Sequence, residues 1–147
     1  MNDIFRVSLV QFDPKWEDVE YNLSRLGSLM QPLVGKTDLI VLPEMFTTGF
    51  SMNTNKICST NNYNETTQWM KQQAQATGAM IVGGMAVNDL SPNPSPQDRG
   101  EERYYNRLHW INPDGDGGQY DKHFLFSMSD EPKHYTPGIE QKRFEWL

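Results

Sequence analysis

Two residues able to form an acid–base pair stand where strands are expected to end. Glu44 follows the apolar run DLIVL at 38–42, and Lys122 follows the segment GQYD at 118–121. In open α/β sheets, ligands collect beyond the carboxyl ends of the strands, so a carboxylate and an ammonium group placed there can converge on one pocket. Each residue also has a plainer interpretation. Glu44 can be a loop carboxylate bonded to backbone amides, and Lys122 a surface lysine at a hairpin end.

The hydrophobic pattern predicts the elements that position this pair. Strands are expected where β-branched and other apolar residues alternate or run continuously, and helices where apolar residues recur every three or four positions. The expected strands are 4–12, 38–42, 79–87, 103–111 and 119–121, and the expected helices are 17–34 and 62–77. This order predicts one α/β domain over residues 1–147, with helices covering one face of a sheet.

The segments between these elements carry turn residues. The Pro-rich stretch 88–102 is predicted to be a solvent loop at a hairpin tip, and 112–118, with its two Asp-Gly steps, a tight turn. Residues 123–138 read as an ordered loop, and 142–147 as the start of a further strand. The Gly pair at 83–84, inside a strand, indicates a close approach of the backbone to a neighbour.

Composition excludes several classes of protein. The net charge is −6, from 13 basic and 19 acidic residues, and no basic run marks a nucleic-acid binder. No apolar run approaches the roughly 18 residues that span a bilayer, and the N-terminus does not resemble a signal peptide. The single cysteine, Cys58, excludes an internal disulfide and a Cys-based zinc cluster, and it suits a reducing cytoplasm. No GxGxxG follows the first strand, which argues against a Rossmann-type cofactor binder.

Five segments resemble the nitrilase superfamily of carbon–nitrogen hydrolases in order and spacing. They are VSLVQFDPKWEDVEYNL, DLIVLPEMFTTGFSMN, AMIVGGMAV, RYYNRLHWINPDG and YDKHFLFSMSDEPKHYTPG. Together they cover nearly the whole chain except the Pro-rich stretch 88–102. PEMFTTGFSM and the YDKHFLF segment are most similar to the omega-amidase branch. The combination is specific, whereas a lone Leu-Pro-Glu or Tyr-Asp-Lys would be weak evidence.

The resemblance implies a four-layer αββα sandwich, of which this chain is the N-terminal part. It also implies a Glu–Lys–Cys triad with a second Glu close by. The family's Leu-Pro-Glu motif places the first Glu at Glu44, its Tyr-x-Lys motif places the Lys at Lys122, and the second Glu falls at Glu131. The nucleophilic Cys of the family lies on a strand-to-helix elbow after a strand such as KRFEWL. The chain ends at Leu147, before any such elbow, and is therefore expected to be inactive alone.

The chemistry implied by this resemblance is hydrolysis of the terminal amide of a small 2-oxo acid, such as 2-oxoglutaramate, through a thioester. No metal or organic cofactor is expected, and the family commonly forms homodimers. Other branches, acting on N-carbamoyl amines or aliphatic amides, stay open. So does an inactive chain that works only by binding or association. The inner face of its sheet would lack a cover, and exposed apolar patches and strand edges favour association.

Several site assignments have competing interpretations. Glu131 has an acidic neighbour, Asp130, and either residue can be a helix N-cap or a solvated loop acid. Phe46, Phe50 and Met52 are predicted to wall a substrate pocket, although aromatic loop residues are equally often simple packing residues.

The remaining reactive side chains are predicted to play structural roles. Cys58 lies in a polar stretch that matches no elbow, so an ordinary small side chain is the favoured interpretation. His109 is expected to pack within the sheet, His123 to support a loop, and His134 to be exposed. Their spacing fits no metal site.

Overall fold

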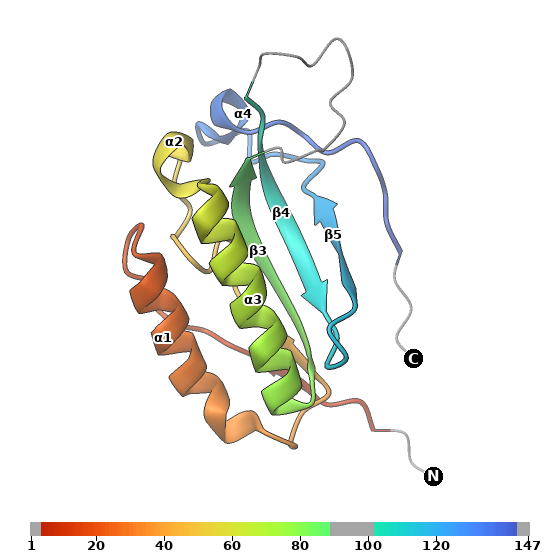
Figure 1. The fold of residues 1–147 in the computed structure, drawn as a ribbon. Helices are drawn as coiled ribbons and strands as arrows, with labels where there is room; N and C mark the ends of the chain where they lie inside the picture. The colour runs from red at the N-terminus through yellow and green to blue at the C-terminus, as the bar shows by residue number, and fades with distance from the viewer. Residues whose placement is uncertain (1–3, 89–101, 144–147) are drawn as a thin grey trace.

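A computed structural model describes residues 4–88 and 102–143 of the chain (Figure 1). The strands are β1 (Val7–Leu9), β2 (Leu39–Val41), β3 (Met80–Asn88), β4 (Tyr104–Ile111) and β5 (Gly117–Asp121). The helices are α1 (Val19–Met30), the short 3-10 helix η1 (Gln31–Leu33), α2 (Thr54–Ile57), α3 (Thr60–Thr77) and α4 (Glu131–His134). The predicted α/β class is therefore confirmed.

The described strands form one mixed sheet in the order β1-β2-β3-β4-β5. β1, β2 and β3 are parallel to one another, and β4 is antiparallel to both of its neighbours, β3 and β5. The carboxyl ends of β2 and β5 consequently lie at the same edge of the sheet as the end of β3. This edge carries the residues that follow those strands.

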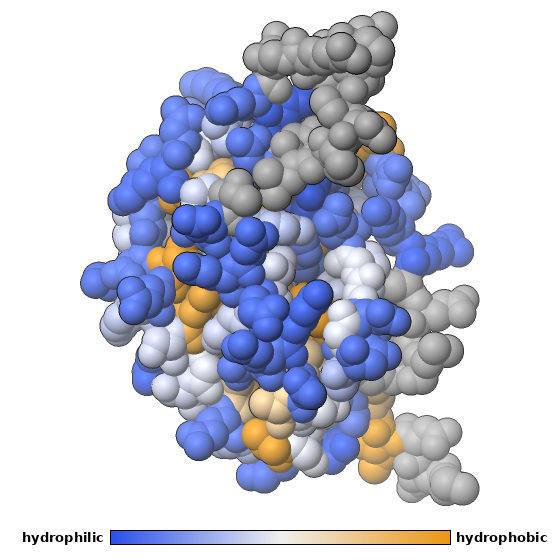
Figure 2. Space-filling view, viewed as in Figure 1, coloured by the Kyte–Doolittle hydropathy of each residue, from blue (hydrophilic) through white to orange (hydrophobic). Residues whose placement is uncertain are grey.

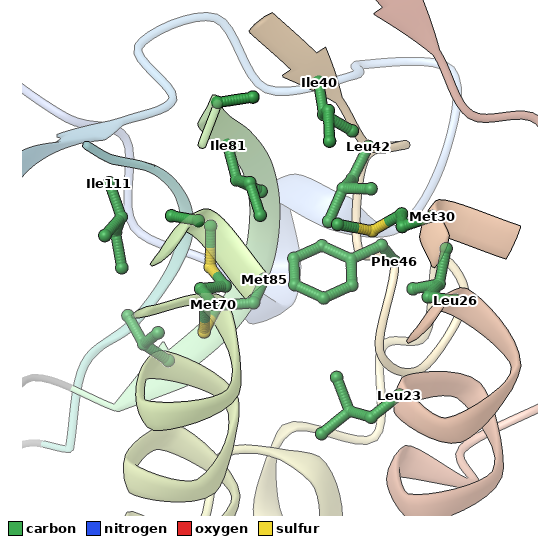
Figure 3. Packing of buried hydrophobic residues seen from close by; sticks show 13 residues of the cluster. Leu23, Leu26, Met30, Ile40, Leu42, Phe46, Met70, Ile81, Met85 and Ile111 are labelled. Atoms are coloured by element: carbon green, nitrogen blue, oxygen red, sulfur yellow. The ribbon is translucent and has the colours of Figure 1, made fainter. Parts of the chain in front are cut away.

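A hydrophobic core fills the space between the sheet and the pair α1 and α3, as Figures 1 and 3 show. Ile40, Ile81 and Ile111 face each other in register across β2, β3 and β4. Leu26 of α1 and Met70 of α3 pack against this row and are fully buried. The prediction that helices cover one face of the sheet is confirmed, because the apolar stripe of each helix is buried there.

Capping residues explain where the two long helices begin and end. The carboxylate of Asp18 accepts a hydrogen bond from Tyr21 N at the start of α1, and Gly78, in the left-handed region at φ 69°, closes α3. The helix predicted over 17–34 is shorter than expected. It ends at Met30, and a 3-10 turn containing Pro32 follows, because proline cannot donate to the α-helical ladder.

Other predicted boundaries differ from the structure. The strand expected at 4–12 pairs only over Val7–Leu9, because among the described strands β1 lies at the sheet edge and pairs with β2 alone. The returning strand begins earlier than expected, at Gly117. Residues 123–138 contain the one-turn helix α4 rather than loop alone, and α2 was also not predicted.

Two predictions fall wholly or partly beyond the described residues. Residues 89–101, which make up nearly all of the predicted Pro-rich loop, lie outside them. Residues 144–147, which make up most of the strand expected at 142–147, also lie outside them. Residues 142 and 143 are described and are not part of a strand.

The two faces of the sheet differ in what covers them. Over α1 and α3 the surface is mostly hydrophilic (Figure 2). On the opposite face, Leu9, Val41, Val82 and Trp110 form one apolar row across four strands, and Leu9 is 78% exposed. Among the described residues, a second cluster that contains residues of α2 and the end of α4 covers the end of this face near Ala86. Among the described residues, no helix has the length and apolarity needed to cross a membrane.

Candidate active site

Glu44 is presented by a tight turn that follows β2. The next residue, Met45, is fully buried and has a left-handed φ of 50°, a conformation that costs a non-glycine residue about 1–3 kcal/mol. Phe46 N then donates to the carbonyl of Gly84 in β3, which fixes the turn against the sheet. The side chain of Glu44 is left half exposed at the sheet edge.

Lys122 extends the pairing of β5 by one residue. Its backbone N donates to Asn106 O at 2.9 Å, and its carbonyl accepts from Gly138 N at 2.9 Å. Its side chain turns inward, and Nζ lies 2.7 Å from Glu44 Oε1 and 3.0 Å from Glu131 Oε2. The structure thus brings together the acid and the amine singled out at the two strand ends. The surface-lysine interpretation of Lys122 does not hold.

Glu131 occupies the first position of α4 and is fully buried. Its carboxylate accepts from Phe126 N at 2.6 Å and from both Asn106 Nδ2 and Lys122 Nζ. The alternative acid, Asp130, is exposed and pairs with Lys133 at the surface. The structure therefore places Glu131, and not Asp130, beside the Glu44–Lys122 pair.

Asn106 of β4 is a site residue that sequence reasoning missed. It is only 4% exposed, and its Nδ2 donates to Glu44 Oε1 at 2.6 Å and to Glu131 Oε1 at 2.8 Å. The sequence signal was a polar residue on a strand face that is otherwise formed by Tyr104, Leu108 and Trp110. A buried amide of that kind needs partners, and here its partners are the two acids.

The charges of this cluster stabilise one another. Burial alone would raise the pKa of Glu131, but the hydrogen bonds from Asn106, Phe126 N and Lys122 outweigh it and hold that pKa below its usual value. Burial alone would lower the pKa of Lys122, but its bonds to Glu44 and Glu131 outweigh burial and raise that pKa. At neutral pH the site therefore holds an ammonium group beside an ionised, buried carboxylate.

A cavity of about 270 Å³ adjoins the cluster on the open face of the sheet. Its lining is mostly apolar and includes the charged groups of two site residues: Leu42, Glu44, Gly84, Asn106, Leu108, Tyr120 and Lys122. A larger cavity of about 400 Å³ lies along the β4–β5 edge and touches none of Glu44, Lys122 and Glu131. The smaller cavity is the better candidate site, because it joins apolar walls to a few convergent polar groups.

The three residues predicted to wall a pocket occupy different places. Phe50 is half-buried, with its ring centroid 5.4 Å from Lys122 Nζ, and Met52 packs on the cluster around Tyr135. Phe46 is instead fully buried in the main core, in the middle of the packed side chains of Figure 3. A Cβ on Gly83 would lie 2.7 Å from this ring, so the glycine makes room for it. Of the two interpretations of Phe46, the structure favours packing.

The other reactive side chains lie away from the cluster or are shielded. Cys58 is buried, and burial raises the pKa of its thiol to about 12, so it does not form the thiolate that a nucleophile needs. His109 is buried against Tyr63, and burial lowers its pKa to about 4. His123 Nδ1 contacts Gly138 O, as a loop-supporting residue would, and His134 is exposed. In the described ranges, no group of three or more His, Cys, Asp and Glu side chains is arranged for a metal ion.

Curated relatives match the chain over almost its whole length. Omega-amidase YafV of Yersinia enterocolitica is 36% identical over 143 residues, which are 96% of this chain and 50% of the relative. Omega-amidase YafV of Escherichia coli K12 is 33% identical, over 96% of this chain and 50% of the relative. The 2-oxoglutaramate amidase of Bacillus subtilis is 25% identical, over 95% and 50%. The chain spans about half the length of these relatives.

Solved structures and a family model agree with these matches. XC1258 from Xanthomonas campestris, a CN-hydrolase superfamily protein, superposes with a TM-score of 0.75 at 33% identity, over 97% of this chain and 49% of that one. An amidase from Nesterenkonia sp. shares the fold at a TM-score of 0.76 and 16% identity, over 97% of this chain and 51% of that one. Residues 6–143 match the model of the carbon–nitrogen hydrolases, and the chain belongs to that family.

Proposed function

We propose that this chain is part of an omega-amidase that hydrolyses the terminal amide of a small 2-oxo acid, such as 2-oxoglutaramate, to the acid and ammonia. The observation that carries the proposal is the position of Lys122 Nζ, 2.7 Å from Glu44 and 3.0 Å from Glu131. The substrate class comes from the names of the relatives, two omega-amidases and a 2-oxoglutaramate amidase.

In the proposed mechanism, Glu44 is the general base. It takes the proton of a cysteine thiol, and the thiolate attacks the amide carbon. Glu44 returns the proton to the leaving nitrogen, the carbon–nitrogen bond breaks, and ammonia departs from a thioester. Glu44 then takes a proton from water, and the resulting hydroxide attacks the thioester carbon. The carbon–sulfur bond breaks, the acid product is released, and Glu44 returns its proton to the thiolate.

Lys122 is the proposed oxyanion stabiliser. Each attack places negative charge on the former amide oxygen, and a fixed ammonium group beside it lowers the barrier by about 3–4 kcal/mol. Glu131 has no exposed surface to offer a substrate, so its proposed task is to hold Lys122 in place. The apolar walls Leu42 and Leu108 would contact the carbon chain of the substrate, and Phe50 would lie beside Lys122.

The proposed nucleophile is a cysteine outside these 147 residues. Cys58 is buried, with a raised thiol pKa, and the relatives are about twice as long as this chain. We therefore assign the nucleophile to the segment that follows in the full-length protein. A gene that encodes no cysteine after residue 147 would contradict this assignment. A cytoplasmic homodimer is the proposed assembly, from the family resemblance and the single cysteine.

The test is ammonia release by the full-length protein from three amides: 2-oxoglutaramate, an N-carbamoyl amine and a simple aliphatic amide. We expect kcat/KM for 2-oxoglutaramate to exceed the other two by at least tenfold. Preference for the carbamoyl compound or the aliphatic amide would move the protein to another branch of the family. No hydrolysis of any of the three would contradict the amidase proposal.

A second proposal concerns the 147 residues by themselves, which we expect to associate and to release no ammonia. The row Leu9, Val41, Val82 and Trp110 on the open face supports it, because Leu9 is 78% exposed, the other three are partly exposed, and exposed apolar surface drives association. Sedimentation of the isolated chain tests it. A monomer with amidase turnover would contradict it.

A further inference from the structure

We infer that Asn106 is a positioning residue that gives the two site carboxylates different tasks. It holds one oxygen of Glu44, leaves the other oxygen free for proton transfer, and fixes Glu131 as the counter-ion of Lys122. The inference rests on the proposed amidase function and deepens it, because it names the atom of Glu44 that moves the proton and the residue that selects that atom.

One amide nitrogen of Asn106 donates to both acids. An asparagine Nδ2 carries two hydrogens. Here one goes to Glu44 Oε1 at 2.6 Å and the other to Glu131 Oε1 at 2.8 Å. The backbone carbonyl of Asn106 also accepts from Lys122 N at 2.9 Å. Asn106 is thus bonded to all three candidate catalytic residues, and its own position is fixed by β4 and by burial.

The two carboxylates have unequal surroundings. Both oxygens of Glu131 accept hydrogen bonds, and the residue has no exposed surface. Glu44 is half exposed, and Asn106 and Lys122 both bond to its Oε1. Within the described part of the chain, Oε2 of Glu44 accepts no hydrogen bond. Oε2 is therefore the oxygen available to a thiol or a water, and paired acids in such different environments take different roles.

The neutral charge of the Asn106 amide also matters at this position. Two carboxylates share the single ammonium group of Lys122, and a neutral amide between them adds donors without adding charge. An aspartate at the same place would be almost the same shape but would bring a third acid into the cluster, and neighbouring carboxylates resist ionising together. The titratable groups of the cluster are Glu44, Lys122 and Glu131. Those that face it from neighbouring elements are Tyr120, Tyr135 and Cys58, which packs with Tyr135.

The experiment is the pH dependence of kcat/KM for 2-oxoglutaramate in the full-length protein. For Asn106→Asp we expect the acidic limb of the profile to move up by about one pH unit or more, because of the added carboxylate. Asn106→Leu, which keeps the volume but removes both donors, should also move the limb upward. Asn64→Asp on the exposed surface of α3 is the matched control and should leave the profile unchanged.

A readout independent of turnover accompanies the kinetics. NMR titration of the side-chain carboxyl carbons, without substrate, should show the site titration of Asn106→Asp shifted to higher pH, and thermal melting reports whether each variant is folded. A role in folding alone would lower the melting temperature and kcat while leaving both pH profiles where they are, and that result overturns the inference. Absence of hydrolysis by the wild-type protein would instead contradict the proposed function, and the NMR titration would still decide the role of Asn106.

Discussion

Two buried carboxylates of this chain, Glu17 and Glu131, are held in similar ways. Glu17 accepts from Ser51 Oγ at 2.6 Å and from Lys56 Nζ at 2.8 Å. Glu131 accepts from Asn106 and Lys122, at 2.8 Å and 3.0 Å. In both cases hydrogen bonds to neighbours lower the pKa of the acid, for Glu17 chiefly those from Lys56 and Ser51.

The two regions differ in the exposure of the lysine, in the number of acids that it contacts and in whether a cavity adjoins it. Lys56 of α2 is 61% exposed, and among the described acids it pairs with Glu17 alone; Ser51, in the loop that follows Glu44, also donates to Glu17. Lys122 is 27% exposed, lies between two acids and lines a cavity of about 270 Å³. An acid–lysine pair is therefore weak evidence for catalysis. A second acid and an adjoining cavity separate a site that can do chemistry from a clamp that holds a loop.

The largest effect is expected for Glu44→Gln in the full-length protein. The substitution keeps the shape but removes the proposed general base, so kcat should fall about 10²–10⁴-fold. Because the side chain is half exposed, the melting temperature should change little. Steady-state ammonia release and thermal melting measure the two quantities. A kcat within threefold of wild type would remove Glu44 from the mechanism.

Lys122→Ala should lower kcat about 10²–10³-fold, through loss of the oxyanion stabiliser. It should also cost about 3 kcal/mol in the free energy of unfolding, because Glu131 is left as a buried charge without its partner. Adding Glu131→Gln should recover most of this stability and none of the activity. Urea unfolding and kinetics on the single and double variants test whether the stability effect and the kcat effect of Lys122 are separate. Recovery of both stability and kcat in the double variant would contradict this separation.

The long helices and strands could be predicted because the residue pattern that forms each of them lies within its own segment of the sequence. Apolar periodicity marks α1 and α3, and continuous apolar runs mark the strands at 38–42 and 79–87. α2 and α4 were missed because four-residue helices carry no periodic signal, and they are held by tertiary contacts such as Tyr135 OH to Ser51 O. The ends of β1 were wrong because only one neighbouring strand fixes them.

Site residues that directly follow a strand could be predicted from the sequence. Residues whose role depends on partners from other strands could not. Glu44 follows the apolar strand β2, Lys122 follows the short strand β5, and the strand order brings the two side chains together. Asn106 was missed because a single polar residue in a strand is ambiguous until its partners are known. Phe46 could not be placed in the core from sequence alone, because its position depends on the space left by Gly83 on another strand.

The comparison also predicts how stability depends on pH. Both Glu17 and Glu131 have a lowered folded pKa, so each stabilises the fold above its unfolded pKa of about 4.3 and loses that contribution as pH falls through the folded value. Glu131→Gln and Glu17→Gln should each cost about 1–3 kcal/mol at pH 7 and flatten the loss of stability on acidification. Only Glu131→Gln should also reduce kcat. Urea unfolding from pH 7 to pH 3 and kinetics at pH 7 provide the measurements, and equal kinetic effects would show that the two regions do not differ in function.

The smallest effect is expected for Lys56→Ala. Lys56 is mostly exposed, so water can replace it beside Glu17, and an exposed ion pair contributes only about 0.2–1 kcal/mol. Ser51 Oγ and Asn53 Nδ2 still donate to Glu17 after the substitution, so the loop stays attached and kcat should not change. Lys71→Ala, an exposed lysine of α3, is the matched control. If Lys56→Ala cost as much stability as Lys122→Ala, burial of the lysine and contact with a second acid would not determine how much each lysine stabilises the fold.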